Sequence, residues 1–291
     1  MKLEINNVTK KIDQQLVIDN LSMRLQAGVY GLLGANGSGK TTLFKLICGI
    51  TRLNSGEILY NGQDIAVHAD EFRSILGFLP QDFSYYPDFT GMKFMLYIAA
   101  LKGLKGKLAK QRCIELLELV GLADVKGKKI KKYSGGMKQR LGIAQALIND
   151  PEVLILDEPT VGLDPKERVR FRNLLSSLAE NKIILLSTHI VSDVEYISDE
   201  ILIINGGMIQ NRGSVSELVQ EIEGKVWEVL VQPNELTSFY KKYAISNQKS
   251  QSGGIVLRVV AQMKPAENAQ NVQATLEDLY LYYFREGGLI Q

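Results

Sequence analysis

The feature that most restricts the fold of this chain is the octapeptide GANGSGKT at residues 34–41. It follows the apolar run at residues 29–33, precedes a helical pattern, and matches the phosphate-loop pattern G-x-x-x-x-G-K-[ST]. Gly34, Gly37 and Gly39 let the backbone curve into a nest whose N–H groups point at phosphate oxygens. The helix that follows adds the positive end of its dipole. Because motif and context agree, we predict a phosphate-binding loop rather than a glycine-rich turn without function.

The side chains at the end of this loop suit a nucleoside triphosphate and its metal ion. Lys40 can reach the β- and γ-phosphates, Thr41 can hold Mg²⁺ through its hydroxyl group, and Thr42 is placed near the α-phosphate. The complete set of predicted phosphate-binding residues is Gly34, Ala35, Asn36, Gly37, Ser38, Gly39, Lys40, Thr41 and Thr42.

Two acidic residues, Asp157 and Glu158, follow the apolar run at residues 153–156. Charges at the end of an otherwise buried strand cost free energy unless they meet a cation or a ligand. Asp157 suits Mg²⁺, directly or through water, and Glu158 suits a base that aligns or activates water against a γ-phosphate. The alternative is that both acids only cap a helix that begins after PTVGLD. Beside a phosphate loop, we favour the catalytic interpretation.

Three further polar residues fit the same site. Gln81 in FLPQDF could sense Mg²⁺ or the attacking water, Asp164 in VGLDP could orient groups across an interface, and His189 in LLSTHI could contact the γ-phosphate. Each also has a plainer explanation: Gln81 as part of a polar turn, Asp164 as an N-cap before Pro165, and His189 as a surface histidine. Taken alone, these three residues do not decide between the two explanations.

Short apolar runs alternate with helical patterns along much of the chain. Continuous apolar strands that alternate with helices predict an α/β fold whose mostly parallel sheet is covered on both faces. The apolar runs lie at residues 29–33, 152–160, 182–188 and 200–206.

The strand signal disappears between about residues 83 and 150, where helical periodicity takes over. Met137, Leu141, Ala144 and Ile148 are spaced four, three and four residues apart, which places them on one helix face. The pattern predicts a helical subdomain inserted into the α/β core.

A composition shift follows residues 211–218. From there the pattern indicates a strand, a helix, a second strand, a polar stretch and an aromatic helix, TLEDLYLYYFRE. We therefore predict a main domain over residues 1–215 and a small accessory α+β region over residues 216–291.

The overall composition limits the partners and the cellular compartment that we expect for this protein. A net charge of +2 gives no reason to expect a nucleic-acid partner. The two cysteines, Cys48 and Cys113, are too few for a disulfide framework and favour a reducing compartment. The chain opens with the polar stretch MKLEINNVTK, which lacks the pattern of a secretory signal. Its apolar runs are far shorter than the ~20 residues that a membrane-spanning helix needs.

Read together, the motifs occur in an order that resembles the nucleotide-binding domains of ABC transporters, over residues 1 to about 215. The resemblance implies a P-loop NTPase core with an added antiparallel β portion, and it implies ATP and Mg²⁺ as ligands. It also implies a head-to-tail dimer that holds two ATP molecules at its interface. The motifs are the phosphate loop, Gln81, YSGGMKQR at 133–140, LILDEP at 154–159, GLD at 162–164 and STH at 187–189.

The resemblance also implies a role for each site residue. Ser134, Gly135 and Gly136 meet the γ-phosphate that a second subunit holds, with Ser134 also acting as N-cap of its helix. Glu158 acts as the catalytic base. Gln81 contacts Mg²⁺ or the attacking water, His189 contacts the γ-phosphate, and Asp164 orients groups across the interface. The implied metal-binding residues are Thr41, Gln81 and Asp157.

The sequence departs from the family pattern at three positions. Tyr133 stands where a leucine is usual, and Met137 where a glutamine is usual, but neither change removes the Ser-Gly-Gly core. Ile12 stands where the family commonly places an aromatic residue that stacks on adenine. We therefore expect weaker ATP affinity or looser base selectivity than is usual.

Residues 163–209 and the C-terminal LED followed by an aromatic helix look like bacterial drug, antibiotic and sodium exporter ATPases. The resemblance implies permease subunits in the membrane, a second ATPase subunit that we expect to be a copy of this chain, and a location at the cytoplasmic face of the membrane. An importer, a non-transport ABC ATPase and a switch with little turnover remain alternatives. A P-loop kinase or GTPase would lack SGG followed by LDEP. The C-terminal region is open to either a packing or a regulatory role.

Overall fold

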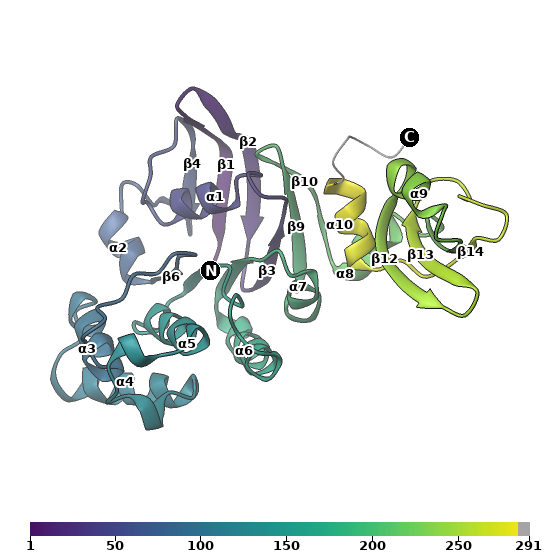
Figure 1. Cartoon of the computed structure of the whole chain (residues 1–291). Coiled ribbons are helices and arrows are strands. Elements are labelled where there is room, and N and C mark those ends of the chain that lie inside the picture. Colours follow the sequence, from purple (N-terminus) through teal and green to yellow (C-terminus); the bar gives the residue numbers. More distant parts are fainter. Residues whose placement is uncertain (285–291) are drawn as a thin grey trace.

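A mixed sheet of six strands forms the centre of the molecule in a computed structural model that describes residues 1–284. The strand order is β10-β9-β3-β8-β7-β6, and all neighbours are parallel except β9 and β10 (Figure 1). The strands are β3 (Gly28–Leu33), β6 (Leu76–Leu79), β7 (Val153–Asp157), β8 (Ile183–Ser187), β9 (Glu200–Asn205) and β10 (Met208–Gly213). The prediction of a mostly parallel sheet is confirmed.

A second, antiparallel sheet carries the N-terminal part of the chain. Its order is β2-β1-β4-β5, and it packs with helix α1 on one face of the central sheet. Its strands are β1 (Leu3–Ile12), β2 (Gln15–Leu25), β4 (Ser55–Tyr60) and β5 (Gln63–Asp64). This sheet is the antiparallel portion that the family resemblance implies.

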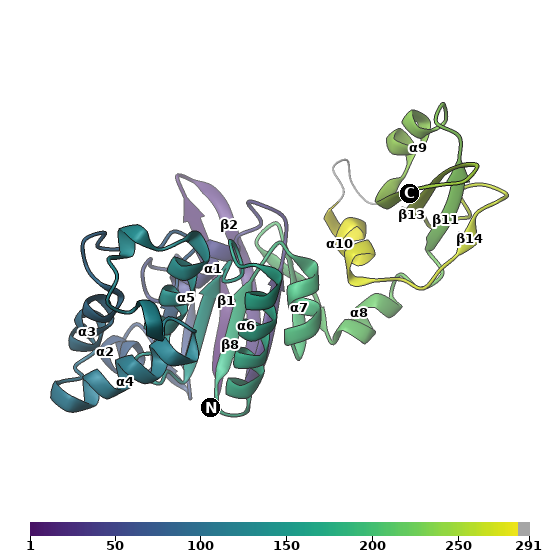
Figure 2. The same ribbon diagram turned by 60° about the horizontal axis from the view of Figure 1, so that its bottom comes forward.

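Helices cover the central sheet, and those between β6 and β7 form a lobe at one side of it (Figures 1 and 2). The α-helices of the first 220 residues are α1 (Lys40–Ile47), α2 (Ala69–Ser74), α3 (Gly91–Leu101), α4 (Gly106–Leu119), α5 (Gly135–Ala146), α6 (Pro165–Leu178), α7 (Val191–Ile197) and α8 (Val215–Gln220). Short 3-10 helices lie at Ala123–Val125, Ile130–Lys132 and Ala179–Asn181. Within residues 1–284, every helix is too short or too polar to cross a lipid bilayer.

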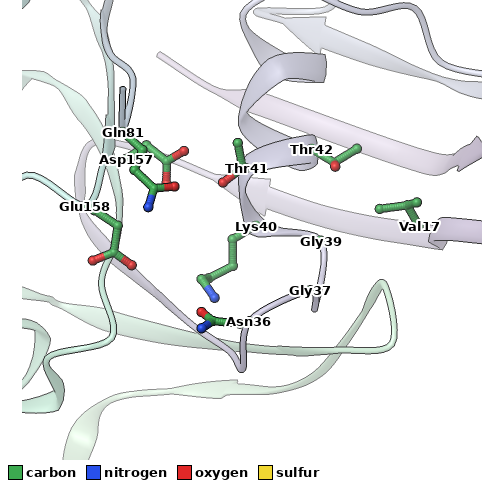
Figure 3. Close-up of a pocket in the computed structure, with 10 residues that line it drawn as sticks. All are labelled: Val17, Asn36, Gly37, Gly39, Lys40, Thr41, Thr42, Gln81, Asp157 and Glu158. Carbon is green, nitrogen blue, oxygen red and sulfur yellow. The ribbon is translucent and has the colours of Figure 1, made fainter. Parts of the chain in front are cut away.

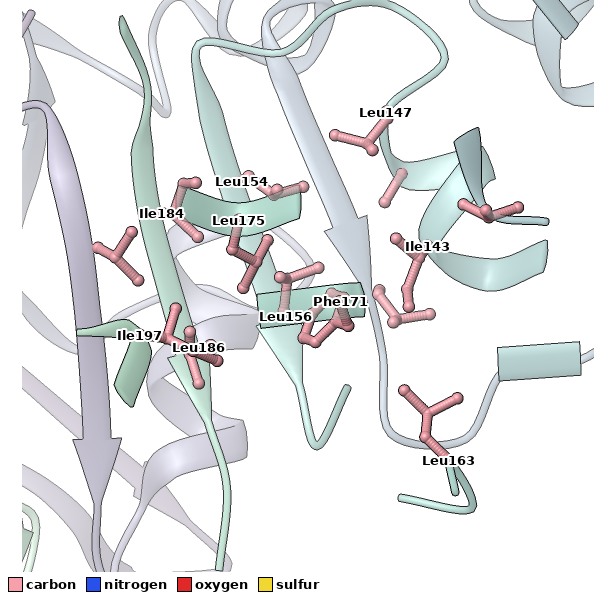
Figure 4. Close-up of a cluster of buried hydrophobic side chains, with 14 of the residues drawn as sticks. Ile143, Leu147, Leu154, Leu156, Leu163, Phe171, Leu175, Ile184, Leu186 and Ile197 are labelled. Atoms are coloured by element: carbon pink, nitrogen blue, oxygen red, sulfur yellow. The ribbon is translucent and has the colours of Figure 1, made fainter. Parts of the chain in front are cut away.

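Alternate residues of the central strands enter two different hydrophobic cores. Leu154, Leu156, Ile184 and Leu186 pack with the helices on one face, among them α6 through Phe171 and Leu175 (Figure 4). The intervening residues Ile155, Ile183 and Leu185 pack on the other face with α1 and the antiparallel sheet. This two-sided burial explains why these strands are continuously apolar in sequence.

The C-terminal region has its own four-stranded antiparallel sheet, ordered β12-β13-β11-β14. Helix α10 lies between this sheet and α7 (Figure 2). The elements are β11 (Val226–Val231), α9 (Leu236–Lys242), β12 (Ala244–Gln251), β13 (Gly254–Val260), β14 (Gln270–Asn271) and α10 (Leu276–Phe284). The sequence pattern missed β12, because this edge strand is largely exposed and carries polar residues instead of an apolar alternation.

Candidate functional site

A cavity of about 380 Å³ opens at the carboxyl ends of β3 and β7, with the phosphate loop along one side (Figure 3). Crevices at this edge of an open α/β sheet are the usual place for a ligand. The lining residues are Val17, Asn36, Gly37, Gly39, Lys40, Thr41, Thr42, Gln81, Asp157 and Glu158. Nine of these ten were predicted from the sequence; Val17 on β2 was not.

The phosphate loop needs its glycines for two separate reasons. Gly37 and Gly39 have φ angles of 80° and 106°, in the left-handed region that favours glycine. A Cβ at Gly34 would lie 2.4 Å from Ser38 Oγ and 2.6 Å from the carbonyl oxygen of Ile204, closer than real Cβ contacts. Ala35 continues the loop and its carbonyl accepts a hydrogen bond from the Ser38 N–H at 3.2 Å. The motif therefore fixes a tight loop that leads into α1.

Lys40 folds back onto the loop that carries it. Its Nζ donates to the carbonyl oxygens of Gly34 at 2.6 Å and Ala35 at 3.0 Å. Burial lowers the pKa of this ammonium group, and the carboxylates of Glu158 and Asp157 partly oppose the shift. The positive charge is thus held in the cavity by carbonyl dipoles and by two nearby acids.

Asp157 is almost fully buried at the end of β7. Ser187 Oγ, on the neighbouring strand β8, donates to Asp157 Oδ1 at 2.6 Å. Asp157 Oδ2 is buried and has no hydrogen-bond partner, although a buried carboxylate oxygen left unpaired is costly. Thr41 and Gln81 line the same cavity (Figure 3). These oxygen ligands are of the kind that Mg²⁺ prefers.

Glu158 has an unusual backbone and a fixed side chain. Its φ angle is 52°, rare for a residue other than glycine, and its N–H lies 3.2 Å from the Ser187 carbonyl oxygen and 3.1 Å from Ser187 Oγ. His189 Nδ1 donates to Glu158 Oε2 at 2.8 Å, and the His189 N–H lies 3.4 Å from the same oxygen. The histidine side chain is otherwise exposed.

Glu158 and His189 were both predicted to belong to one site, but their direct contact was not predicted. The signal was present in the order of the strands. Because β7 and β8 are parallel neighbours with Asp157 opposite Ser187, the residues just beyond these two strands must lie side by side. An acid and a histidine at those two positions are therefore within hydrogen-bond reach.

The Ser-Gly-Gly segment lies outside this cavity. Ser134 caps α5, accepting a hydrogen bond from the Met137 N–H at 3.2 Å, and both Ser134 and Gly135 are exposed. Gly136 packs closely, since a Cβ there would lie 3.0 Å from the carbonyl oxygen of Gly162. The segment thus presents a capped helix end to solvent.

Two other predicted residues have simple local contacts. Asp164 is exposed and caps α6, accepting from the Glu167 N–H at 2.9 Å, which is the plainer of its two explanations. Ile12 ends β1 with 45% of its surface exposed and does not line the cavity. Val17 on β2 lines the cavity and supplies its apolar wall instead (Figure 3).

Comparisons with known proteins place this architecture in a family. The family model described as ABC transporter matches residues 18–161. The chain is 37% identical over 254 residues to the Nod factor export ATP-binding protein I of Burkholderia lata, covering 84% of each chain. It is 36% identical over 269 residues to the uncharacterized ABC transporter ATP-binding protein YdbJ of Bacillus subtilis, covering 91% of this chain and 86% of that protein.

Solved structures agree with these relatives. One described as an ATP-binding subunit of an ABC transporter superposes with a TM-score of 0.70 and 26% identity, covering 76% of this chain and 93% of the other. A dimeric ATP-binding cassette bound to ADP and Pi shares the fold with a TM-score of 0.67 and 24% identity, covering 73% of this chain and 98% of the other. This chain therefore belongs to the family of ABC transporter ATP-binding proteins, and it is an ATPase.

Proposed function

We propose that this chain is the ATP-hydrolysing subunit of a membrane exporter and works as a head-to-tail dimer of identical chains at the cytoplasmic face of the membrane. One observation supports the proposed dimer. The phosphate loop and the two acids line the cavity, whereas Ser134 and Gly135 are exposed outside it. The exporter direction rests on the 37% identical relative named for Nod factor export. In this proposal residues 1–215 form the ATPase domain, 83–150 its helical subdomain, and 216–291 an accessory region.

In this proposal, different residues of the cavity bind different parts of the nucleotide and its metal ion. The backbone N–H groups of residues 34–42 and the start of α1 hold the phosphates. Lys40 exchanges its carbonyl partners for the β- and γ-phosphate oxygens. Asp157, through its unpaired Oδ2, would hold Mg²⁺ together with Thr41 and Gln81, and the bound ion would neutralise charge on the phosphates.

Glu158 is suited to act on the attacking water. His189 occupies Oε2 and fixes the orientation of the carboxylate, so we assign Oε1 to the water that attacks the γ-phosphate. In this proposal His189 positions Glu158 and also contacts the γ-phosphate. Asp164 and the Ser134–Gly136 segment complete the site of the partner chain.

The helical lobe offers the surface that we assign to the permease. Tyr86 stacks on Phe89 with ring centroids 4.9 Å apart and meets the edge of Tyr97 at 5.3 Å. Tyr86 and Tyr97 are partly exposed, as is the apolar side chain of Leu101 on the same helix as Tyr97. Aromatic residues of this kind are common anchors in protein interfaces. The segment that bears Tyr86 begins near Gln81, so this surface is connected along the chain to the ATP site.

A pull-down tests the transporter assignment. A tagged Glu158→Gln chain, which is expected to stay closed on Mg-ATP, is recovered from gently solubilised native membranes and its partners are identified. The proposal predicts a multi-span membrane protein that is lost when Tyr86 and Tyr97 are both changed to serine. Recovery of the chain alone, or with ribosomes or DNA-bound proteins, would contradict the transporter role and favour a soluble ATP-driven switch.

A further inference from the structure

The backbone at Glu158 needs support, because its positive φ angle persists only where the surrounding structure fixes it. Part of this support comes from Ser187 at the end of strand β8, which accepts a hydrogen bond from the Glu158 N–H. Another part comes from a residue that the mechanism above does not use. Gln139 Nε2 donates to the carbonyl oxygens of Glu158 at 3.3 Å and Pro159 at 3.0 Å.

Gln139 belongs to the helix whose first turn carries the Ser-Gly-Gly segment. Ser134 caps α5 and Gln139 is the fifth residue after it, so the two are separated by about 7.5 Å along one rigid helix. The contact between the helix start and the loop after Glu158 is close, as the packing of Gly136 against the Gly162 carbonyl shows. A shift of the helix start would therefore reach both carbonyl groups through Gln139.

We propose that Gln139 is a positioning residue that couples the two ATP sites of the dimer. In this inference, which rests on the head-to-tail dimer proposed above, Ser134 meets the nucleotide held by the partner chain. Gln139 conveys the position of α5 to the backbone of Glu158, which serves the chain's own nucleotide. Binding at one site then sets the orientation of the base at the other.

The same helix provides a matched control. Gln145 Nε2 donates to the carbonyl oxygen of Phe78 on β6 at 2.8 Å, and its side chain is partly buried like that of Gln139. A change of either glutamine to leucine removes a side-chain amide that donates hydrogen bonds to backbone carbonyl oxygens, two at Gln139 and one at Gln145. Only the change at Gln139 acts on the backbone of Glu158, so the pair separates coupling from general loss of packing.

The test measures steady-state hydrolysis against ATP concentration for the wild type, Gln139→Leu and Gln145→Leu. Gln139→Leu is expected to lower kcat about 10- to 100-fold, as loss of two hydrogen bonds implies, and to bring the Hill coefficient to about 1 from a higher wild-type value. ATP binding is expected to stay within about twofold, because Gln139 does not touch the nucleotide. Gln145→Leu should keep the wild-type Hill coefficient.

Two results would overturn the coupling. One is an unchanged kcat and Hill coefficient in Gln139→Leu, or in Gln139→Met should the leucine variant not fold. The other is the same loss of cooperativity in Gln145→Leu. The Glu158→Gln chain separates these failures from failure of the proposed function: if it still hydrolyses ATP normally, the assignment of the base is wrong, whereas if it is inactive, only the role of Gln139 is rejected.

Discussion

At the scale of single residues, the buried charge of Lys40 opposes stability. Its ammonium group is buried and contacts carbonyl oxygens of its own loop. Burial lowers its pKa below the ordinary value of 10.5, so the folded chain holds this proton less tightly than the unfolded chain does. The free energy of unfolding therefore increases as pH rises from the folded pKa of Lys40 to its unfolded pKa. Triphosphate oxygens would remove this penalty.

We predict that Lys40→Ala leaves the nucleotide-free protein at least as stable as the wild type, because it removes a desolvated charge. Mg-ATP should raise the melting temperature of the wild type and leave that of the variant unchanged, since ligand stabilisation requires binding. Lys45→Ala, at an exposed position on the same helix, serves as control. An ATP-dependent rise of wild-type size in Lys40→Ala would contradict the role given to Lys40.

Ile12 carries a second prediction at this scale. Stacking of a base on an aromatic ring contributes roughly 1–3 kcal/mol in single-stranded nucleic-acid binders. Ile12→Tyr should therefore bind ATP more tightly than the wild type and widen its preference for ATP over GTP. Leu16→Tyr, on the opposite strand of the same hairpin, controls for added aromatic surface. No gain in ATP affinity in Ile12→Tyr would reject the adenine position assigned to Ile12.

The residues near the cavity beside the phosphate loop differ in how far the sequence reveals them. The phosphate loop, Asp157 and Glu158 are visible because contiguous motifs and a buried strand place them. Val17 and Gln139 are not, since the first lies on a neighbouring sheet and the second acts through backbone carbonyls far away in sequence. Contacts of this kind follow from tertiary packing and leave no local pattern.

At the scale of elements, helix α10 begins in a closed polar network. Its buried Asp278 accepts from Arg258 on β13, from Ser246 on β12, and from the Thr275 N–H and hydroxyl at 2.8 and 2.7 Å. Burial acts to raise the pKa of Asp278, but the hydrogen bonds from Arg258, Ser246 and Thr275 outweigh it, so the pKa lies below the ordinary value of 3.8. The residues TLED therefore tie α10 to the C-terminal sheet.

We predict that Asp278→Asn destabilises the C-terminal region by about 3 kcal/mol at neutral pH, because it breaks a buried ion pair. A lowered acid pKa stabilises the fold at pH values above 3.8, and this contribution is lost as pH falls through the folded pKa. The gap in unfolding free energy between wild type and variant should therefore shrink only below about pH 4. A gap that stays constant down to the lowest folded pH would contradict this origin. Glu277→Gln, exposed one residue earlier, should leave stability nearly unchanged.

The elements themselves were predicted best where burial shapes the sequence. The core strands β7 and β8 are buried on both faces and read as continuous apolar runs. The edge strand β12 is polar and exposed, so it gave no such signal. Its pairing with β13 depends on backbone hydrogen bonds, which the sequence does not display.

At the scale of the whole molecule, one hydrophobic core joins the C-terminal region to the ATPase domain. Leu276 and Leu279 of α10 are fully buried in the same cluster as Val194 and Ile197 of α7. Helix α7 begins two residues after His189, so helix α10 of the accessory region packs on the helix that directly follows this histidine. The sequence predicted the region but could not show this contact, because the packing partners lie about 80 residues apart in the chain.

We propose that ATP is bound between two chains and hydrolysed with the help of Glu158. The most direct measurement is the solution mass and turnover of Glu158→Gln at saturating Mg-ATP. We predict twice the mass of one chain, with hydrolysis slower by about 10²- to 10⁴-fold, and a return to the single-chain mass when Ser134→Arg is added. A Glu158→Gln chain that stays monomeric in Mg-ATP and turns over at the wild-type rate would contradict it.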